Sequence, residues 1–227
     1  MDPAPLPSGM IDDDTLAAGE FGNWITDMQL ALRGEQDATV PCGDCTACCT
    51  SSQFVHIAPD ETETLARIPD ALHFAAPRMP RGHVLLGYDE RGHCPMLVDG
   101  ACSIYEHRPR TCRTYDCRVF PAAGVEDDDE SKQRITLRAR RWRFDYATPN
   151  DETRHAAVVA AATYLQEQAE GLDERDRPMT TTQLAVLAVE IHDLFVAEVQ
   201  GPLRQFTSAV DGLAVEIARR RGRPAIT

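Results

Sequence analysis

Eight cysteines lie in two groups, and their spacing is the feature of this chain that most directly indicates chemistry. Spacings of three residues bring the sulfur atoms of one tight loop toward a common point. Thiolates are soft ligands that favour zinc, copper(I) or iron–sulfur centres over magnesium or calcium. Four thiolates can hold one tetrahedral zinc ion or one 4Fe–4S cluster, so the chain has enough thiols for a metal centre. The candidate metal ligands are Cys42, Cys45, Cys48, Cys49, Cys94, Cys102, Cys112 and Cys117.

Two other interpretations of the cysteines are weaker. Free thiols can pack as small apolar side chains, but packing alone does not call for eight of them at these spacings. The first residues, Met1–Pro7, lack the basic and apolar regions of a secretory signal. We therefore expect a cytoplasmic protein, in which structural disulfides are rare and the cysteines bind metal. Spacing leaves zinc and an iron–sulfur cluster both open, and the ferredoxin spacing is not met.

The adjacent pair Cys48 and Cys49 limits how the site can be built. Two neighbouring residues rarely present both sulfur atoms to one small ion without a strained ring. Either the two cysteines serve two centres, or one is a ligand while the other supports it or acts as a redox-active thiol. The two cysteine groups lie about 45 residues apart, so the fold must bring residues 94–117 back over the first loop.

Basic and aromatic residues surround the second cysteine group. Arg108, Arg110, Arg113 and Arg118 would offset the negative charge of the thiolates and lower their pKa values. The alternative is that these arginines are solvated or paired with carboxylates. We single out Arg108, Arg113 and Tyr105 as candidate cofactor contacts.

Two further side chains near the second group have both a structural and a functional interpretation. Tyr115 either shields the site or, like Tyr105, relays a proton or an electron. His93, beside Cys94, is the histidine best placed to add a ligand, although a lone histidine is more often solvated or satisfied.

Charge and composition exclude several other classes of function. The net charge of −13 and the pI of about 4.9 disfavour nucleic-acid binding. No run of 18 apolar residues occurs, so no membrane-spanning helix is predicted. No Walker loop, HExxH or Gly-x-Ser-x-Gly motif supports a nucleotide-binding or hydrolase function.

The cysteines must be positioned by short, irregular elements. Residues 1–39 form a loose acidic segment with one helix predicted over 23–32, and residues 40–147 form a small metal-binding domain. Acidic residues in its first turn predict a helix over 59–67. A turn at 89–92 predicts a hairpin leading into Cys94. Strands are predicted at 53–57, at 84–88 and, from alternating apolar residues, once or twice within 135–146.

Residues 148–227 have the pattern of helices. Pro149 suits a first helical position, and Thr180 with Gln183 forms a capping-box pattern. Apolar residues at steps of three and four, including a run from Leu203 to Ile217, predict about three helices between 150 and 220. The expected fold class is α+β, with a cysteine-rich domain of short strands packed on a C-terminal helical bundle. The alternative for the helices is a face for dimerisation or for a protein partner.

The cysteine region resembles a known family. The string CGDCTACC (42–49), followed by CPMLVDGACSIYEHRPRTCRTYDC (94–117), is similar to the YkgJ-like cysteine-cluster family. This is the CxxCxxCC group, described as zinc- or iron-chelating and often labelled an Fe–S oxidoreductase. The resemblance covers roughly residues 40–119, retains all eight family cysteines and implies that they bind metal. A flagellin lysine N-methylase is similar in its cysteine region, but we find no S-adenosylmethionine motif here.

Three hypotheses for function follow. The first is a metal protein with an iron–sulfur or zinc centre and a redox or electron-transfer role, and hence an oxidoreductase component. The second is a zinc-stabilised interaction module without catalysis, in which metal supplies folding energy that a thin core lacks. The third is a protein-modifying enzyme, such as a methylase, that uses the cluster structurally. The sequence names no catalytic residue for any of them.

Overall fold

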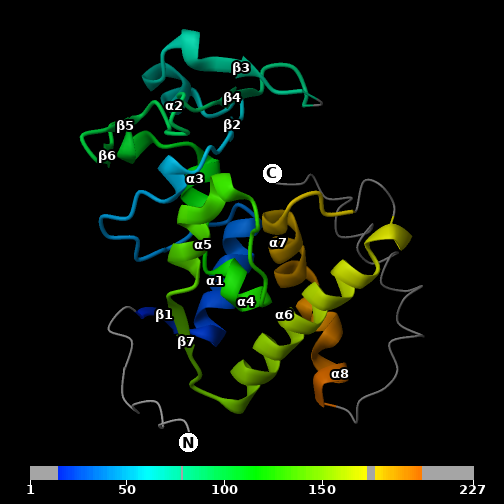
Figure 1. The fold of residues 1–227 in the computed structure, drawn as a ribbon. Helices are drawn as coiled ribbons and strands as arrows, with labels where there is room; N and C mark the ends of the chain where they lie inside the picture. The colour runs from blue at the N-terminus through cyan, green and yellow to red at the C-terminus, as the bar shows by residue number, and fades with distance from the viewer. Residues whose placement is uncertain (1–14, 78, 173–176, 201–227) are drawn as a thin grey trace, which may run out of the picture.

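The elements of this chain are short outside its C-terminal half. A computed structural model describes residues 15–77, 79–172 and 177–200 and has an α+β fold (Figure 1). The helices are α1 (Phe21–Leu32), α2 (Thr62–Arg67), α3 (Arg110–Thr114), α4 (Val119–Ala123), α5 (Gln133–Ala139), α6 (Pro149–Glu167), α7 (Thr181–Ile191) and α8 (Val196–Gln200). The strands are β1 (Leu16–Glu20), β2 (Val55–Ile57), β3 (His73–Ala75), β4 (Val84–Leu86), β5 (Leu97–Val98), β6 (Ala101–Cys102) and β7 (Trp142–Asp145).

The larger hydrophobic core lies among α1, α4, α6 and α7. Helix α6 begins at Pro149 behind a capping box, in which Thr148 and Asp151 each bond the other's backbone N–H. Ala157 and Ala161 on α6 are completely buried, and small side chains let neighbouring helices approach closely. Each fully buried Leu, Ile or Val contributes roughly 1.5–3 kcal/mol, so this core anchors the fold.

A parallel pair of strands ties the start of the chain to its middle. Strand β1 pairs with β7, with Leu16 opposite Trp142 and Glu20 opposite Asp145. β1 runs directly into α1, and β7 leads to α6, so the pair aligns two core helices. Trp142 is 2% exposed and belongs to the larger core.

The elements β2 to β6 and α2 form a second body, here called the small lobe (residues 55–107), which lies above the core helices in Figure 1. Strands β2, β4 and β3 form an antiparallel sheet in that order, and β5 pairs with β6 in a short hairpin. The lobe has its own core, formed by Val55, Ile57, Ile68, Leu86 and Ile104.

One predicted strand is wrong. The alternation of Ile135, Leu137 and Ala139 predicted a strand, but these residues lie in helix α5. Ile135 and Ala139 are four residues apart and both buried, whereas Leu137 is 52% exposed. Ile135 and Ala139 therefore lie on the buried face of a helix, and most residues of α5, such as Gln133, Arg138 and Ala139, are good helix formers. The strand predicted next to it exists as β7.

Most other predicted elements are present with shifted bounds. The helix predicted from 59 begins at Thr62, and α1 begins two residues before the predicted start. The turn at 89–92 forms, with Gly92 at a φ of 77°, but no strand follows it before β5, and β4 pairs with β2 and β3 instead.

The C-terminal helices are found in part. Helices α6 and α7 pack together, while the helix predicted over 203–217 lies outside the described residues. In the part of the chain that the structure describes, no helix combines the length and apolar character of a membrane span.

Candidate metal centre

The eight cysteines lie where the two cores meet. Cys42 and Cys45 are in the loop after α1, and Cys48 and Cys49 begin a 3-10 turn. All eight are free thiols. In the second segment, Cys94 precedes β5, Cys102 ends β6, Cys112 lies in α3, and Cys117 lies two residues before α4.

Backbone hydrogen bonds join the two cysteine segments. The N–H of Cys94 donates to the carbonyl of Cys49 at 2.7 Å. The N–H of Ala38 donates to the carbonyl of Arg113 at 2.8 Å, so the approach to the first loop runs beside α3. These bonds bring residues 94–117 back to the first loop.

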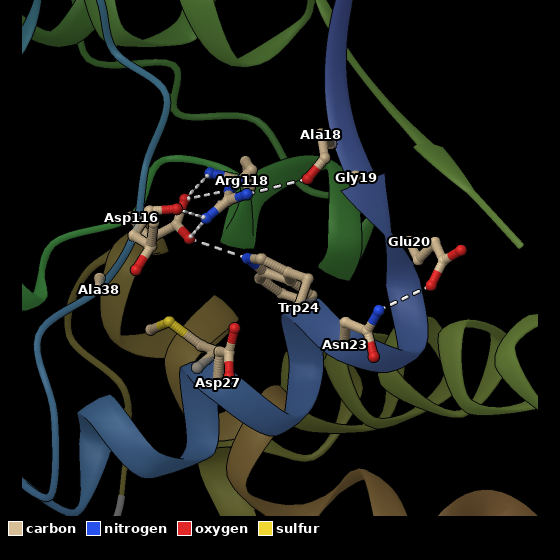
Figure 2. A pocket seen from close by; sticks show the side chains of 11 residues that line it. Ala18, Gly19, Glu20, Asn23, Trp24, Asp27, Ala38, Asp116 and Arg118 are labelled. Atoms are coloured by element: carbon tan, nitrogen blue, oxygen red, sulfur yellow. Dashed lines mark hydrogen bonds and ion pairs between the residues drawn. The ribbon is translucent and has the colours of Figure 1, made fainter.

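A buried ion pair holds the segment that carries Cys117. Asp116 and Arg118, on either side of this cysteine, form a 2.7 Å salt bridge, and the Trp24 indole N–H donates to Asp116 at 2.8 Å (Figure 2). Arg118 also donates to the carbonyls of Ala18 at 2.9 Å and Thr39 at 2.7 Å. One guanidinium therefore connects β1, the approach to the first cysteine loop and Asp116, the residue before Cys117.

Three further donors contact the cysteine loops from the segment after Cys117. The Trp142 indole N–H donates to Cys117 Sγ at 3.2 Å. Lys132, the only lysine in the chain, donates to the carbonyls of Ser51 and Ser52 at 2.9 and 3.0 Å. Arg138 donates to the carbonyl of Cys42 at 3.2 Å. Local sequence patterns predict none of these three contacts, and the only hint is that the chain has a single lysine.

The thiols raise one another's pKa values. Burial and then the neighbouring thiols of Cys94 and Cys102 raise the pKa of Cys49 to about 11. Burial and then the thiols of Cys49, Cys94 and Cys102 raise the pKa of Cys112 to about 12, although the residue as a whole is exposed.

The same effect operates beside the larger core. The pKa of Cys117 is raised to about 11, first by burial, and the Trp142 N–H opposes the rise. The pKa of Cys48 is raised well above 9.0 by burial and by Cys117. Repulsion between neighbouring thiolates makes it costly to deprotonate these thiols singly. A bound cation offsets that repulsion, so several thiols can lose their protons when it binds.

The donor set fits a soft metal, but the thiols do not yet converge. Eight reduced sulfur atoms with mutual repulsion are the ligands that zinc and iron–sulfur centres use. Among the described residues, no three His, Cys, Asp or Glu side chains stand in a geometry that could hold an ion. A metal would therefore have to draw the thiols closer together.

The three candidate cofactor contacts lie at the surface near α3. The Arg108 guanidinium stacks over the Tyr105 ring, 3.9 Å from its centroid, and Tyr105 is 60% exposed. Arg108 opposes the rise in the pKa of Cys112. Arg113 pairs with Asp37 at 2.8 Å. The role of these three residues toward a cofactor stays a prediction.

The other candidate side chains differ in whether they have a bonding partner. The buried Tyr115 hydroxyl has no hydrogen-bond partner among the described residues, and its pKa is raised by burial and then by the thiols of Cys48 and Cys117. An unpaired hydroxyl beside two thiols is a ready donor to a thiolate. Of the remaining arginines near the second group, Arg110 pairs with Asp60 at 2.7 Å.

Comparison with known proteins agrees with the cysteine pattern. Residues 41–138 match the CxxCxxCC family. Its model is described as a "Putative zinc- or iron-chelating domain" and covers less than half of the chain. No curated protein and no solved structure matches the chain. The match to this CxxCxxCC domain extends past Cys117 to residue 138, so it includes the two loop contacts made by Lys132 and Arg138.

The raised pKa values predict how the metal-free chain responds to pH. Cys49 and Cys117 have pKa values of about 11 when folded, against an ordinary 9.0. Protons bound more tightly in the folded state stabilise it below pH 9, and this stabilisation is lost as the pH rises through 11. Urea unfolding of the reduced, metal-free chain should give a midpoint that falls between pH 9 and 11.

A matched variant checks the origin of this pH dependence. Cys49→Ser removes one of the titrating thiols, so its midpoint should fall less steeply over the same pH range. A wild-type midpoint that stays constant or rises from pH 9 to 11 would contradict the raised pKa values.

Proposed function

We propose that the CxxCxxCC domain binds zinc or an iron–sulfur centre. The proposed ligands are Cys42, Cys45, Cys48, Cys49, Cys94, Cys102, Cys112 and Cys117. The observation that carries the proposal is that two distant segments bring free thiols close together, so that burial and then neighbouring thiols raise the pKa values of Cys48, Cys49 and Cys112. Metal is the partner that this arrangement favours, because it neutralises several thiolates at once.

Bound metal would join the two lobes of the chain. The first cysteine loop is fixed to the larger core by Arg118 through Thr39 and by Lys132 through Ser51. Cys94 and Cys102 pack against the core of the small lobe. Thiolates from both sides on shared metal would hold the lobes together more strongly than the backbone bonds between them.

Electron transfer is a second candidate function, favoured by exposure. Cys42 and Cys112 are exposed residues, and the stacked pair of Arg108 and Tyr105 lies at the surface beside α3. An iron–sulfur cluster supplies one-electron chemistry when bound, whereas zinc has none. A cluster held at this edge would lie within reach of a redox partner, with Arg108, Arg113 and Tyr105 as the nearby contacts.

The pocket in Figure 2 does not favour a methylase. It has a volume of about 280 Å³ and is lined by residues of β1 and α1 with Asp116 and Arg118. Four of the five N–H groups of the Arg118 guanidinium already bond to Asp116, Ala18 and Thr39, so only one is left for a substrate.

Metal analysis of the whole chain tests the proposal. The protein is purified without oxygen, its visible spectrum is recorded, and iron, zinc and sulfide are measured per chain. We expect stoichiometric zinc, or iron with sulfide and broad visible absorption. Cys45→Ser should bind less metal per chain and have a lower melting temperature, because it removes a ligand from the first loop.

The neighbouring substitution Thr46→Ser is the matched control and should keep both metal and stability. A chain without metal under these conditions would overturn the proposal. A colourless chain with stoichiometric zinc would keep metal binding and remove electron transfer.

A further inference from the structure

The side chains of the adjacent cysteines Cys48 and Cys49 point in different directions. They are consecutive residues of a 3-10 turn, in which successive side chains diverge by about 120°. Ala47, just before the turn, packs against the larger core. The carbonyl of Cys49 accepts the N–H of Cys94, which packs against the core of the small lobe. The turn therefore lies at the boundary between the two cores, with one neighbour on each side.

On the side of the larger core, Cys117 is the fixed point. It is 6% exposed, belongs to that core and accepts the Trp142 N–H. Helix α5, whose Ile135 and Ala139 belong to that core, contacts the 3-10 turn that carries Cys48. The bond from Cys45 N–H to the Cys42 carbonyl holds these two residues in one tight turn. Arg138 of α5 donates to the same carbonyl, which places this turn beside the larger core.

On the side of the small lobe, Cys94 and Cys102 flank the β5–β6 hairpin. Leu97 pairs with Cys102 in the sheet, and its N–H donates to the carbonyl of Cys94 at 3.0 Å. After burial, these two thiols raise the pKa of Cys49 the most.

Helix α3 brings the fourth thiol to this side. The Thr111 hydroxyl donates to the carbonyl of His56 on β2 at 2.8 Å, which fixes α3 against the small lobe. After burial, the thiols of Cys49, Cys94 and Cys102 raise the pKa of Cys112.

Building on the proposed metal binding, we propose that the eight cysteines form two separate four-thiolate centres, with Cys48 a ligand of one and Cys49 a ligand of the other. The first centre comprises Cys42, Cys45, Cys48 and Cys117. The second comprises Cys49, Cys94, Cys102 and Cys112. Each set has the four thiolates that a closed zinc site or a 4Fe–4S cluster requires.

Each centre has its own neighbouring donors or cations. Trp142 donates to Cys117, and the unpaired Tyr115 hydroxyl lies beside Cys48 and Cys117 on the first side. On the second side, the Arg108 guanidinium opposes the rise in the pKa of Cys112. Such groups offset the negative charge that four thiolates leave after binding a divalent ion.

Cobalt titration of the full chain tests the division. The reduced, metal-free protein is titrated with Co²⁺ without oxygen, and tight equivalents are counted from the thiolate-to-cobalt absorption. Wild type should saturate at two equivalents, Cys48→Ser at one and Cys49→Ser at one. The double variant of both residues should bind none tightly, and Thr46→Ser should bind two.

A second pair of substitutions keeps the test valid if the buried turn does not tolerate serine. Cys42→Ser and Cys102→Ser should each leave one equivalent, and their combination should leave none. Cys42→Ser combined with Cys48→Ser lies within one set, so it should still leave one equivalent. Circular dichroism shows which variants are folded.

The outcomes separate the two proposals. Saturation of wild type at one equivalent, or loss of all binding in both Cys42→Ser and Cys102→Ser, would overturn the division and leave metal binding intact. A folded wild-type chain that binds no cobalt would overturn metal binding itself.

Discussion

Replacing Arg118 by alanine should lower the free energy of unfolding by about 3–5 kcal/mol, as expected when one partner of a buried ion pair is removed. Arg118 is 7% exposed and Asp116 3% exposed. The substitution leaves the Asp116 carboxylate buried with the Trp24 N–H as its remaining side-chain donor, and it removes the donors to Ala18 and Thr39. Chemical denaturation followed by circular dichroism measures the loss.

The exposed pair of Arg140 and Glu126 supplies the matched control. Its two nitrogen–oxygen distances, 2.7 and 2.6 Å, are as short as those of the buried pair, but both side chains are more than half exposed. Solvent screens such pairs, so Arg140→Ala should not measurably change the unfolding midpoint. Equal losses in the two variants would show that burial is not what makes Arg118 important.

Removing metal with a chelator should open the small lobe and leave the helical core folded. The binding free energy of a structural zinc site is about 10–16 kcal/mol at neutral pH. The core of the small lobe has only five buried side chains among the described residues, while the larger core spans α1, α4, α6 and α7. Hydrogen exchange should show protection lost from β2 and β4 and retained in α6 and α7.

The double variant Cys48→Ser with Cys49→Ser is the control for this experiment. Its small lobe should exchange rapidly with or without chelator, because its metal centres are already lost. Protection that stays uniform after metal removal would show that the small lobe is stable by itself. Loss of protection in α6 and α7 as well would show that the metal supports the whole fold.

Local patterns in the sequence determined several features of this protein. The cysteine spacing indicated a metal-binding domain, and the matching family has the same description. Pro149 marked the start of α6, because proline suits the first position of a helix wherever that helix is placed. Helix α1 and strand β7 were likewise readable, since the periodicity of a single segment reports its buried face.

Local patterns failed where one pattern fits two structures. Ile135, Leu137 and Ala139 alternate as in a strand, yet Ile135 and Ala139 also share one face of a helix. Only burial against the larger core distinguished the two, and it left Leu137 in solvent. Tertiary packing therefore decided α5, and with it the positions of Lys132 and Arg138 at the first cysteine loop.

The arrangement of the cysteines between two cores was decided by tertiary structure alone. Trp24 bonds Asp116 across 92 residues, and Trp142 bonds Cys117 across 25. Such contacts carry no local signal, because their partners are chosen by how whole helices and strands pack. The sequence by itself identified the eight thiols and the chemistry they favour. Which thiols lie beside one another depends on the fold, since the side chain of each residue is directed by the core against which its own segment packs.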